Sequence, residues 1–197
     1  PEAPVPRPTD HAKRHEIADR AFQLVLERGV QAINMSQLAR DLHMKRPTLY
    51  WYFPDLGSLF DTVVENVREV QPTVFGGVPR VWEKFYSGIQ IAIAEGTAFQ
   101  KWACAMALNV AFRVVDLNLA HEPVPWILRA QYQLASMLVL KNIRKSMGLD
   151  RCRWMLTGAA PVSPQLVRWY LALGLQLLEI YGQTENVGMA TVTYPGD

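Results

Sequence analysis

The 197-residue sequence has few cysteines, little net charge and no long apolar run, and each shortage excludes a class of protein. The two cysteines, Cys104 and Cys152, have no metal-binding or redox spacing, which is typical of a protein in a reducing cytoplasm. No uninterrupted apolar run reaches the roughly 18 residues that a membrane span needs, and no signal peptide is recognisable. We therefore expect no membrane span and a cytoplasmic location.

The composition indicates a globular protein but does not indicate what the protein binds. Half of the residues are hydrophobic, 19% are charged and the net charge is +2, so the chain can bury a core and is expected to be mostly helical. Residues 1–67 hold eight Lys or Arg against nine Asp or Glu, a net charge of −1. Any affinity of this part for nucleic acid must therefore come from the placement of basic residues.

The N-terminal region begins with four prolines between Pro1 and Pro8, which predict a disordered arm over residues 1–10. Thr9 or Asp10 is then the expected N-cap of a helix with apolar residues at helical spacing. Gly29 is expected to end that helix.

The stretch INMSQLARDLHMKRPTLYWYF, residues 33–53, predicts two short helices across a tight turn. Asn34 can cap a helix that starts at Met35, and Pro47 suits the first turn of a second helix that ends near Tyr52. Basic, hydroxyl and aromatic side chains on the second helix suit phosphates and base edges in a DNA groove. The alternative is that its apolar residues simply form the core of a small domain, which we expect for Leu49 and its neighbour Phe53.

The segment RPTLYWYF, followed by PDLGSLFDTVVENV, resembles the DNA-binding domain of the TetR family of transcriptional repressors over residues 11–67. The resemblance implies a helix-turn-helix domain that binds duplex DNA as a homodimer and needs no cofactor to do so. Leu56 and Ser36 stand where that family often has basic residues, which is expected to lower the affinity. The implied DNA-contact positions are Lys45, Arg46, Pro47, Thr48, Tyr50, Trp51 and Tyr52.

The pattern changes from about Val70 onward. A short apolar strand and a Gly-Gly turn are expected first, then three helices, and finally a strand-loop-helix-strand unit that runs into YGQTENVG. Both loops of this unit leave the carboxyl ends of strands, where open α/β sheets bind ligands. The expected ranges are strand 73–75, helices 80–95, 98–120 and 125–147, strand 153–156, helix 164–173 and strand 176–180.

Two short motifs in this unit suit a nucleotide. The small residues of the GAAP loop allow a flat base to approach the backbone, and Tyr181 can stack on that base. Thr184 can hydrogen-bond a phosphate, and Glu185 can hold Mg²⁺ on phosphate oxygens. Each motif alone is equally well explained as a turn, but the two together favour a nucleotide site.

The segments VQPTVFGGVPRVWEKFYSGI, GLDRCRWMLTGAAPVSP and YGQTENVG resemble three consecutive parts of the long-chain fatty-acid–CoA ligases of the adenylate-forming, AMP-binding family, over residues 68–197. The resemblance implies ATP-dependent formation of an acyl-adenylate with Mg²⁺, followed by transfer of the acyl group to CoA. It implies a metal ligand, Glu185. The implied nucleotide-binding positions are Gly158, Ala159, Ala160, Pro161, Tyr181, Gly182, Gln183 and Thr184.

The two resemblances predict a fusion that is mainly α-helical. A helix-turn-helix domain of three to four helices would precede a helical and partly α/β fragment of an adenylate-forming domain. The main hypothesis is a DNA-binding transcriptional regulator of TetR type that responds to a fatty acyl or acyl-CoA ligand. The alternatives are a fatty-acid–CoA ligase fragment and a fusion without function. Because the family's phosphate loop and C-terminal lid have no match in the sequence, no ligase activity is expected from this chain alone.

Overall fold

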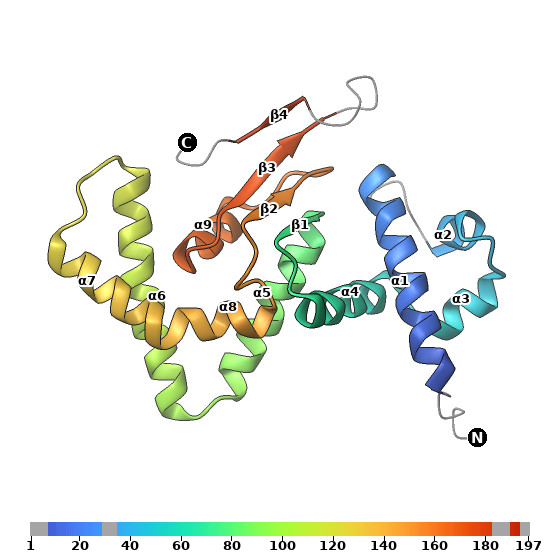
Figure 1. The fold of residues 1–197 in the computed structure, drawn as a ribbon, viewed down its shortest axis with the longest axis horizontal. Helices are drawn as coiled ribbons and strands as arrows, with labels where there is room; N and C mark the ends of the chain where they lie inside the picture. Colours follow the sequence, from blue (N-terminus) through green and yellow to red (C-terminus); the bar gives the residue numbers. More distant parts are fainter. Residues whose placement is uncertain (1–7, 29–34, 183–189, 194–197) are drawn as a thin grey trace. The chain divides into compact units, whose positions relative to one another are not determined.

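The computed structural model describes residues 8–28, 35–182 and 190–193 of the chain (Figure 1). The chain divides into two compact units, Pro1–Asn66 and Val67–Asp197. Across the described residues it is mostly helical with one small mixed sheet, as the sequence predicts at this coarse level.

The first unit consists of helices, and the predicted pair of short helices is confirmed. The helix that was expected to start at Met35 does so, and the following helix ends at Tyr52 as expected. Between them His43 adopts a left-handed conformation, with φ of 53°, which reverses the chain within a few residues. The helices are α1 (Pro8–Arg28), α2 (Met35–Asp41), α3 (Arg46–Tyr52) and α4 (Leu56–Val70), the last turn of which belongs to the second unit.

The N-terminal boundary differs from the prediction. Helix α1 begins at Pro8, so residues 8–10 are helical and the predicted arm over residues 1–10 is too long. Proline lacks a backbone N–H, but an N–H in the first turn of a helix has no partner within the helix, so no hydrogen bond is lost. The φ of proline is also fixed near the helical value, which explains why the helix can start there. Residues 1–7 and the predicted cap Asn34 lie outside the described residues.

The core of the first unit contains the two apolar residues that were expected there. Leu49 and Phe53, which were expected in a core, are both fully buried. Asn66 of α4 is hydrogen-bonded to His15 of α1 and donates to Asp19 of the same helix at 3.0 Å, which ties the ends of the unit's sequence together. The other buried side chains described in this unit include Ile17, Ala18, Ala21, Leu38, Ala39, Leu42, Leu59, Phe60, Val63 and Val64.

The second unit is organised around a sheet with the strand order β1-β2-β3-β4 (Figure 1). The first three strands run parallel, and β4 is antiparallel to β3. The sequence did not predict β4, which has only two residues. The strands are β1 (Val74–Gly77), β2 (Trp154–Thr157), β3 (Leu177–Tyr181) and β4 (Thr191–Val192).

The predicted turn at Gly76 and Gly77 is wrong, because both glycines belong to β1 and pair with β2. A Cβ atom at Gly77 would lie 3.5 Å from the side chains of Trp82 and Val81. That distance is an ordinary van der Waals contact, so crowding does not explain the two glycines. Their strand conformation comes from pairing with β2, which turn propensity cannot reveal.

Helices connect and flank these strands. Helix α6 begins with a capping box in which the Thr97 hydroxyl accepts from Gln100 N and the Gln100 side chain accepts from Thr97 N. The predicted helix over 125–147 is one helical run interrupted by a π-helical segment, η2. The bounds are α5 (Pro79–Glu95), α6 (Ala98–Leu119), α7 (Trp126–Ala135), η2 (Ser136–Leu140), α8 (Lys141–Met147) and α9 (Pro164–Ala172).

An aromatic cluster joins α5 and α9 to the sheet. Trp82 is fully buried and lies edge-on to Phe75 of β1 and Tyr170 of α9, with ring centroids 5.3 and 5.4 Å apart. Its indole N–H donates to Gly77 O at 3.1 Å, and the Tyr170 hydroxyl donates to Trp82 O at 2.9 Å. Burial raises the pKa of Tyr170 well above its ordinary value, so this hydroxyl stays protonated as the donor.

Candidate nucleotide-binding edge of the sheet

The candidate site lies where the neighbouring parallel strands β2 and β3 end. Thr157, the last residue of β2, is in register with Glu179, so Tyr181 ends β3 two residues further along. Helix α9 returns the chain from the first strand end to the start of β3. The structure therefore brings the GAAP loop and Tyr181 to the same edge of the sheet, as predicted from the order of the elements.

The loop after β2 leaves the sheet in close contact with β3. A Cβ atom at Gly158 would lie 3.1 Å from Ile180 O and 3.6 Å from Ile180 Cβ, so glycine lets the two backbones approach closely. Ala159 has a φ of 66°, a left-handed conformation that costs a non-glycine residue roughly 1–2 kcal/mol. Backbone strain of this kind is often concentrated at ligand-binding sites.

The hydroxyl of Thr157 is the group at this edge that sequence reasoning missed. The residue is 1% exposed, and its Oγ1 has no hydrogen-bond partner within the described residues. A buried hydroxyl without a partner costs about 1–3 kcal/mol, which a ligand or a water molecule can recover. The available sequence signal was its position as the last residue of a strand immediately before the GAAP loop.

Tyr181 carries an accessible ring at the end of β3. Its side chain is 58% exposed, and its backbone carbonyl accepts from Ala190 N at 2.9 Å. Antiparallel pairing of Ile180 with Val192 brings the chain back alongside β3 at strand β4. Gly182, the residue after β3, is exposed.

The structure describes only part of the predicted site. Gly158, Ala159, Ala160, Pro161, Tyr181 and Gly182 are described, whereas Gln183, Thr184 and the predicted metal ligand Glu185 lie outside the described residues. The residues present fit a nucleotide, because they combine a close backbone approach, small side chains, an exposed ring and an unsatisfied hydroxyl. Within the described part of the chain, no group of three or more His, Cys, Asp or Glu side chains could hold a metal ion.

The residues predicted to contact DNA lie on and next to α3. Lys45 precedes the helix in an extended conformation, and the side chains of residues 45–48, 50 and 51 are exposed, with Tyr52 half-buried. Trp51 and Tyr52 contact each other edge-on at 4.7 Å between ring centroids. Exposure of these side chains to solvent is therefore not evidence that they contact DNA.

Comparison with known proteins matches residues 23–197 to the AMP-binding enzyme family. The chain is 36% identical to a long-chain-fatty-acid–CoA ligase of Gallus gallus over 148 residues. This aligned region covers 73% of this chain and 18% of that protein. It is 36% identical over 137 residues to a putative fatty-acid–CoA ligase of Mycobacterium tuberculosis, covering 69% of this chain and 24% of that protein. A human long-chain-fatty-acid–CoA ligase is 32% identical over 145 residues, which cover 72% of this chain and 21% of that protein.

The chain thus spans between a fifth and a quarter of the length of most of these relatives, and 18% of the Gallus gallus protein. No solved structure matches the chain.

These findings correct the main functional hypothesis. The family match begins within α1 and includes α2 and α3, the segment interpreted as a DNA-binding head, and the similar proteins are fatty-acid–CoA ligases. The prediction of a TetR-type transcriptional regulator is therefore wrong. Its physical weakness is that two short helices across a tight turn, with buried Leu49 and Phe53 and an exposed outer face, are a general packing arrangement.

The alternative hypothesis is the better one at the level of family. The match covers far more than half of the sequence, and it includes both strand ends at which the GAAP loop and Tyr181 meet. The chain belongs to the family of AMP-binding enzymes.

Proposed function

We propose that this chain is part of an ATP-dependent fatty-acid–CoA ligase and that the edge formed by β2 and β3 receives the adenine nucleotide. The observation that carries the proposal is the convergence of the GAAP loop and Tyr181 on adjacent parallel strands. The names of the similar proteins support a fatty acid and CoA as the other substrates. The relatives are several times longer than the chain, so the complete reaction is part of the proposal.

The proposed reaction has two steps. In the first, a fatty-acid carboxylate oxygen attacks the α-phosphorus of ATP, and pyrophosphate leaves as the acyl-adenylate forms. In the second, the CoA thiol, having lost its proton, attacks the acyl carbonyl carbon, and AMP leaves. Both steps need the nucleotide held in a fixed position, which is the contribution that we assign to this chain.

The residues assigned to the nucleotide have distinct roles in this proposal. The backbone of Gly158 and Ala159 approaches the plane of the base, and the Tyr181 ring packs on it. The buried Thr157 hydroxyl hydrogen-bonds a polar atom of the bound nucleotide. Thr184 would donate to a phosphate oxygen, and Glu185 would hold Mg²⁺, which would offset negative charge on the phosphates.

Titration calorimetry with AMP and with ATP and Mg²⁺ tests the site. Tyr181→Ala should weaken both nucleotides by on the order of tenfold, because stacking of a base on an aromatic ring contributes roughly 1–3 kcal/mol. The matched control is Tyr50→Ala, since Tyr50 is also an exposed tyrosine, 45% accessible, but lies on α3. Equal effects of the two substitutions, or no binding by the unsubstituted chain, would contradict the proposal.

Two further variants separate the roles. Thr157→Val removes an unsatisfied hydroxyl, so it should leave the free chain at least as stable while weakening nucleotide binding severalfold. Glu185→Gln should weaken ATP with Mg²⁺ but leave AMP binding unchanged. Loss of stability without loss of binding in Thr157→Val would show that the hydroxyl serves the fold alone.

A further inference from the structure

Buried polar atoms without a hydrogen-bond partner mark places where a ligand can bind, and the described residues contain three of them. Arg14 Nε belongs to a guanidinium that lies over the ring of Phe53 in the first unit. Trp169 Nε1 belongs to an indole that packs edge-on against Tyr86. Of the three, only Thr157 Oγ1 belongs to a residue at the end of a strand, at the sheet edge that we assign to the nucleotide.

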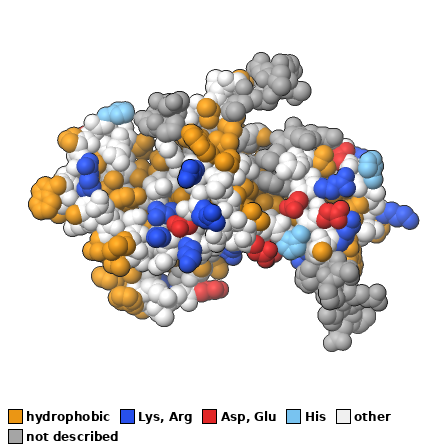
Figure 2. Space-filling view, in the orientation of Figure 1, with side chains coloured by type: hydrophobic (Ala, Val, Ile, Leu, Met, Phe, Trp, Pro, Cys, Tyr) orange, Lys and Arg blue, Asp and Glu red, His pale blue; other side chains and the backbone are white. Residues whose placement is uncertain are grey.

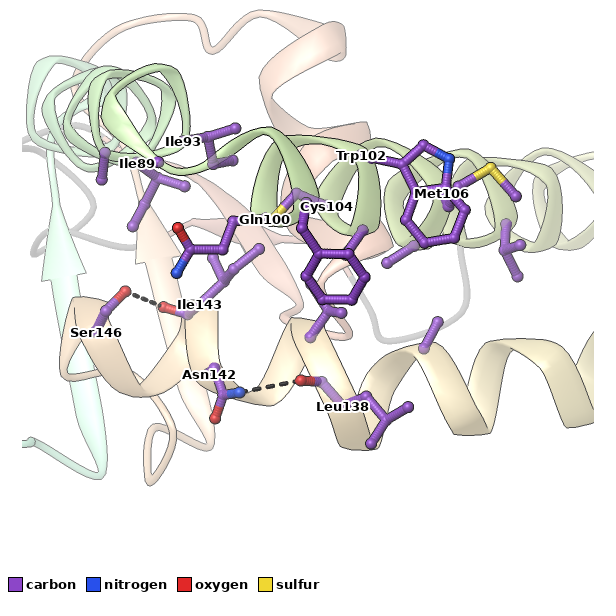
Figure 3. Close-up of a pocket in the computed structure, with 18 of the residues that line it drawn as sticks. Ile89, Ile93, Gln100, Trp102, Cys104, Met106, Leu138, Asn142, Ile143 and Ser146 are labelled. Atoms are coloured by element: carbon purple, nitrogen blue, oxygen red, sulfur yellow. Dashed lines mark hydrogen bonds between the residues drawn. The ribbon is translucent and has the colours of Figure 1, made fainter.

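An apolar groove of about 810 Å³ between α5, α6 and the run from α7 to α8 carries a less specific signal (Figure 3). Figure 2 shows hydrophobic side chains gathered over α6 and α7, two of the helices that line it. Two polar side chains of its wall are bonded within their own helical run, because Asn142 donates to Leu138 O at 3.0 Å and Ser146 donates to Ile143 O at 2.8 Å. Apolar contact specifies no ligand chemistry, whereas the Thr157 hydroxyl requires a hydrogen-bonding group.

The side chain of Thr157 projects from the face of the sheet that α5 covers. Thr157 is in register with Gly77, the last residue of β1, so the two residues face the same side of the sheet. A Cβ atom at Gly77 would lie 3.5 Å from the side chains of Val81 and Trp82, which belong to the beginning of α5. The Thr157 hydroxyl is therefore buried on the side of the sheet where α5 begins.

Helix α5 begins without a side chain that caps its N-terminus. Its N-cap residue is Val78, which has no group that can accept a hydrogen bond from the first turn, and Pro79 follows at the first helical position. The first N–H groups of a helix have no partner within the helix, and the helix dipole gives this end a partial positive charge. An uncapped helix start beside a buried, unpartnered hydroxyl is suited to an anion.

Charge at the edge indicates which end of the nucleotide lies near α5. Thr157 is flanked by Gly77 on β1 and by Glu179 on β3. The exposed carboxylate of Glu179 repels a phosphate on the β3 side, whereas the start of α5 attracts it on the β1 side. Tyr181 follows Glu179 by two residues, so its ring projects from the same face as Thr157. A base on Tyr181 and a phosphate at α5 are then two strand spacings apart, roughly 10 Å, which an extended mononucleotide can bridge.

We propose that the start of α5 and the hydroxyl of Thr157 together hold the α-phosphate of the nucleotide. The hydroxyl donates to one phosphate oxygen, and the first N–H groups of α5 face another. This inference rests on the proposed function, because Tyr181 must hold the base at the same edge. It adds that the phosphorus attacked by the fatty-acid carboxylate lies at the positive end of a helix, which would stabilise the negative charge of the transition state.

Titration calorimetry of the full chain with AMP and with adenosine tests this inference, because the two ligands differ only in the phosphate. Thr157→Val should weaken AMP binding severalfold, since a hydrogen bond to a charged oxygen is lost, and should leave adenosine binding unchanged. Thr157→Ser keeps the hydroxyl and should restore most of the AMP affinity. The matched control is Thr62→Val in the first unit, which should change neither affinity. Thr62 is also 1% exposed, but its hydroxyl donates to Ser58 O at 3.2 Å.

A second variant tests the helix start without changing Thr157. Val78→Thr keeps the shape of the side chain but places a hydroxyl at the N-cap of α5, where it can accept a hydrogen bond from the first turn. Because this cap competes with the phosphate for the same N–H groups, AMP affinity should fall by about threefold while adenosine affinity stays the same. Circular dichroism shows whether each variant is folded.

Three results would overturn this inference and leave the proposed function in place. One is equal affinity of the unsubstituted chain for AMP and adenosine. Another is equal weakening of both ligands by Thr157→Val, which would place the hydroxyl against the base or the ribose. The third is no effect of Thr157→Val on either ligand, which would assign the hydroxyl to a water molecule. Failure of the unsubstituted chain to bind either ligand would instead contradict the proposed function as well.

Discussion

The contacts that stabilise the first unit internally differ from those that stabilise the second. In the first, helices pack through buried side chains such as Leu49. Asn66 of α4 accepts a hydrogen bond from His15 of α1 and donates one to Asp19 of α1, which links the two ends of the unit's sequence. In the second, backbone pairing between Val74 and Trp154 connects strands that lie on either side of a long helical segment. Pairing of this kind fixes the register of distant segments. Chemical groups that are far apart in sequence can therefore meet at one edge in the second unit.

The largest effect should come from Trp82→Ala, because it empties the centre of the second unit. Trp82 is fully buried among aromatic rings, so the substitution should cost about 3–5 kcal/mol. Hydrogen exchange measured by mass spectrometry should show loss of protection in residues 67–182 but not in residues 35–66. Trp154→Ala, which removes a half-exposed tryptophan, is the control. Equal loss in both units would mean that they unfold as one.

Leu49→Ala makes the corresponding change in the first unit and should cost about 3 kcal/mol, because Leu49 is also fully buried. We expect loss of protection in residues 35–66 and unchanged AMP affinity by calorimetry. Tyr50→Ala, its exposed neighbour, should change neither quantity. If Leu49→Ala abolished AMP binding, the separation of the two units would be wrong.

A pair of glycine substitutions has a smaller expected effect. Gly148 has a φ of 76°, and an added Cβ would lie 2.5 Å from the backbone of Val67 and Arg68, so Gly148→Ala should cost at least about 2 kcal/mol. Gly174 has a similar φ of 74°, but its nearest neighbours at 3.1 Å are the flexible side-chain ends of Arg144 and Tyr132. Gly174→Ala should therefore cost only about 1 kcal/mol. Urea denaturation of the two variants measures the difference, and equal costs would contradict it.

The smallest effect concerns the exposed ion pair between α6 and α9. The hydrogen bonds from Arg168 hold the pKa of Asp116 below its ordinary value. A lowered pKa stabilises the fold above the ordinary value, and this contribution is lost as the pH falls through the folded-state pKa. Asp116→Asn should therefore be slightly less stable than the unsubstituted chain at neutral pH and equal to it in strong acid. A stability difference that persists in acid would assign the effect to packing of Arg168 on Phe112.

Local signals predicted most of the helices correctly. Proline at the first turn marks the starts of α3, α5 and α9, and the predicted helix over 98–120 agrees with α6 to within one residue. Gly76 and Gly77 were misplaced because their strand conformation depends on pairing with β2, which no local pattern contains. The short strand β4 was missed for the same reason.

The candidate site was predictable to the extent that it lay in compact motifs. The GAAP loop and Tyr181 were identified from their positions after two strands, whereas the Thr157 hydroxyl needed the structure to show its burial. The wrong prediction of a DNA-binding regulator came from the first unit. Exposed side chains such as Arg46 and Trp51 are compatible with DNA contact, but they are equally compatible with exposure to solvent. A function assigned to exposed residues of one short helix cannot be tested against a second, distant segment. The GAAP loop and Tyr181 are distant in sequence, so their meeting at one sheet edge is such a test.

The pairing of Val74 with Trp154 also constrains how the chain folds. The helices between β1 and β2 depend on local contacts and can form within microseconds, but closing the segment between the two strands carries a large entropy cost. During synthesis β1 emerges long before its partner, so its backbone groups stay unpaired until the helical segment has collapsed. We therefore expect the sheet edge that we assign to the nucleotide to assemble after the helices of the unit. We expect the chain to be most prone to aggregate before this assembly.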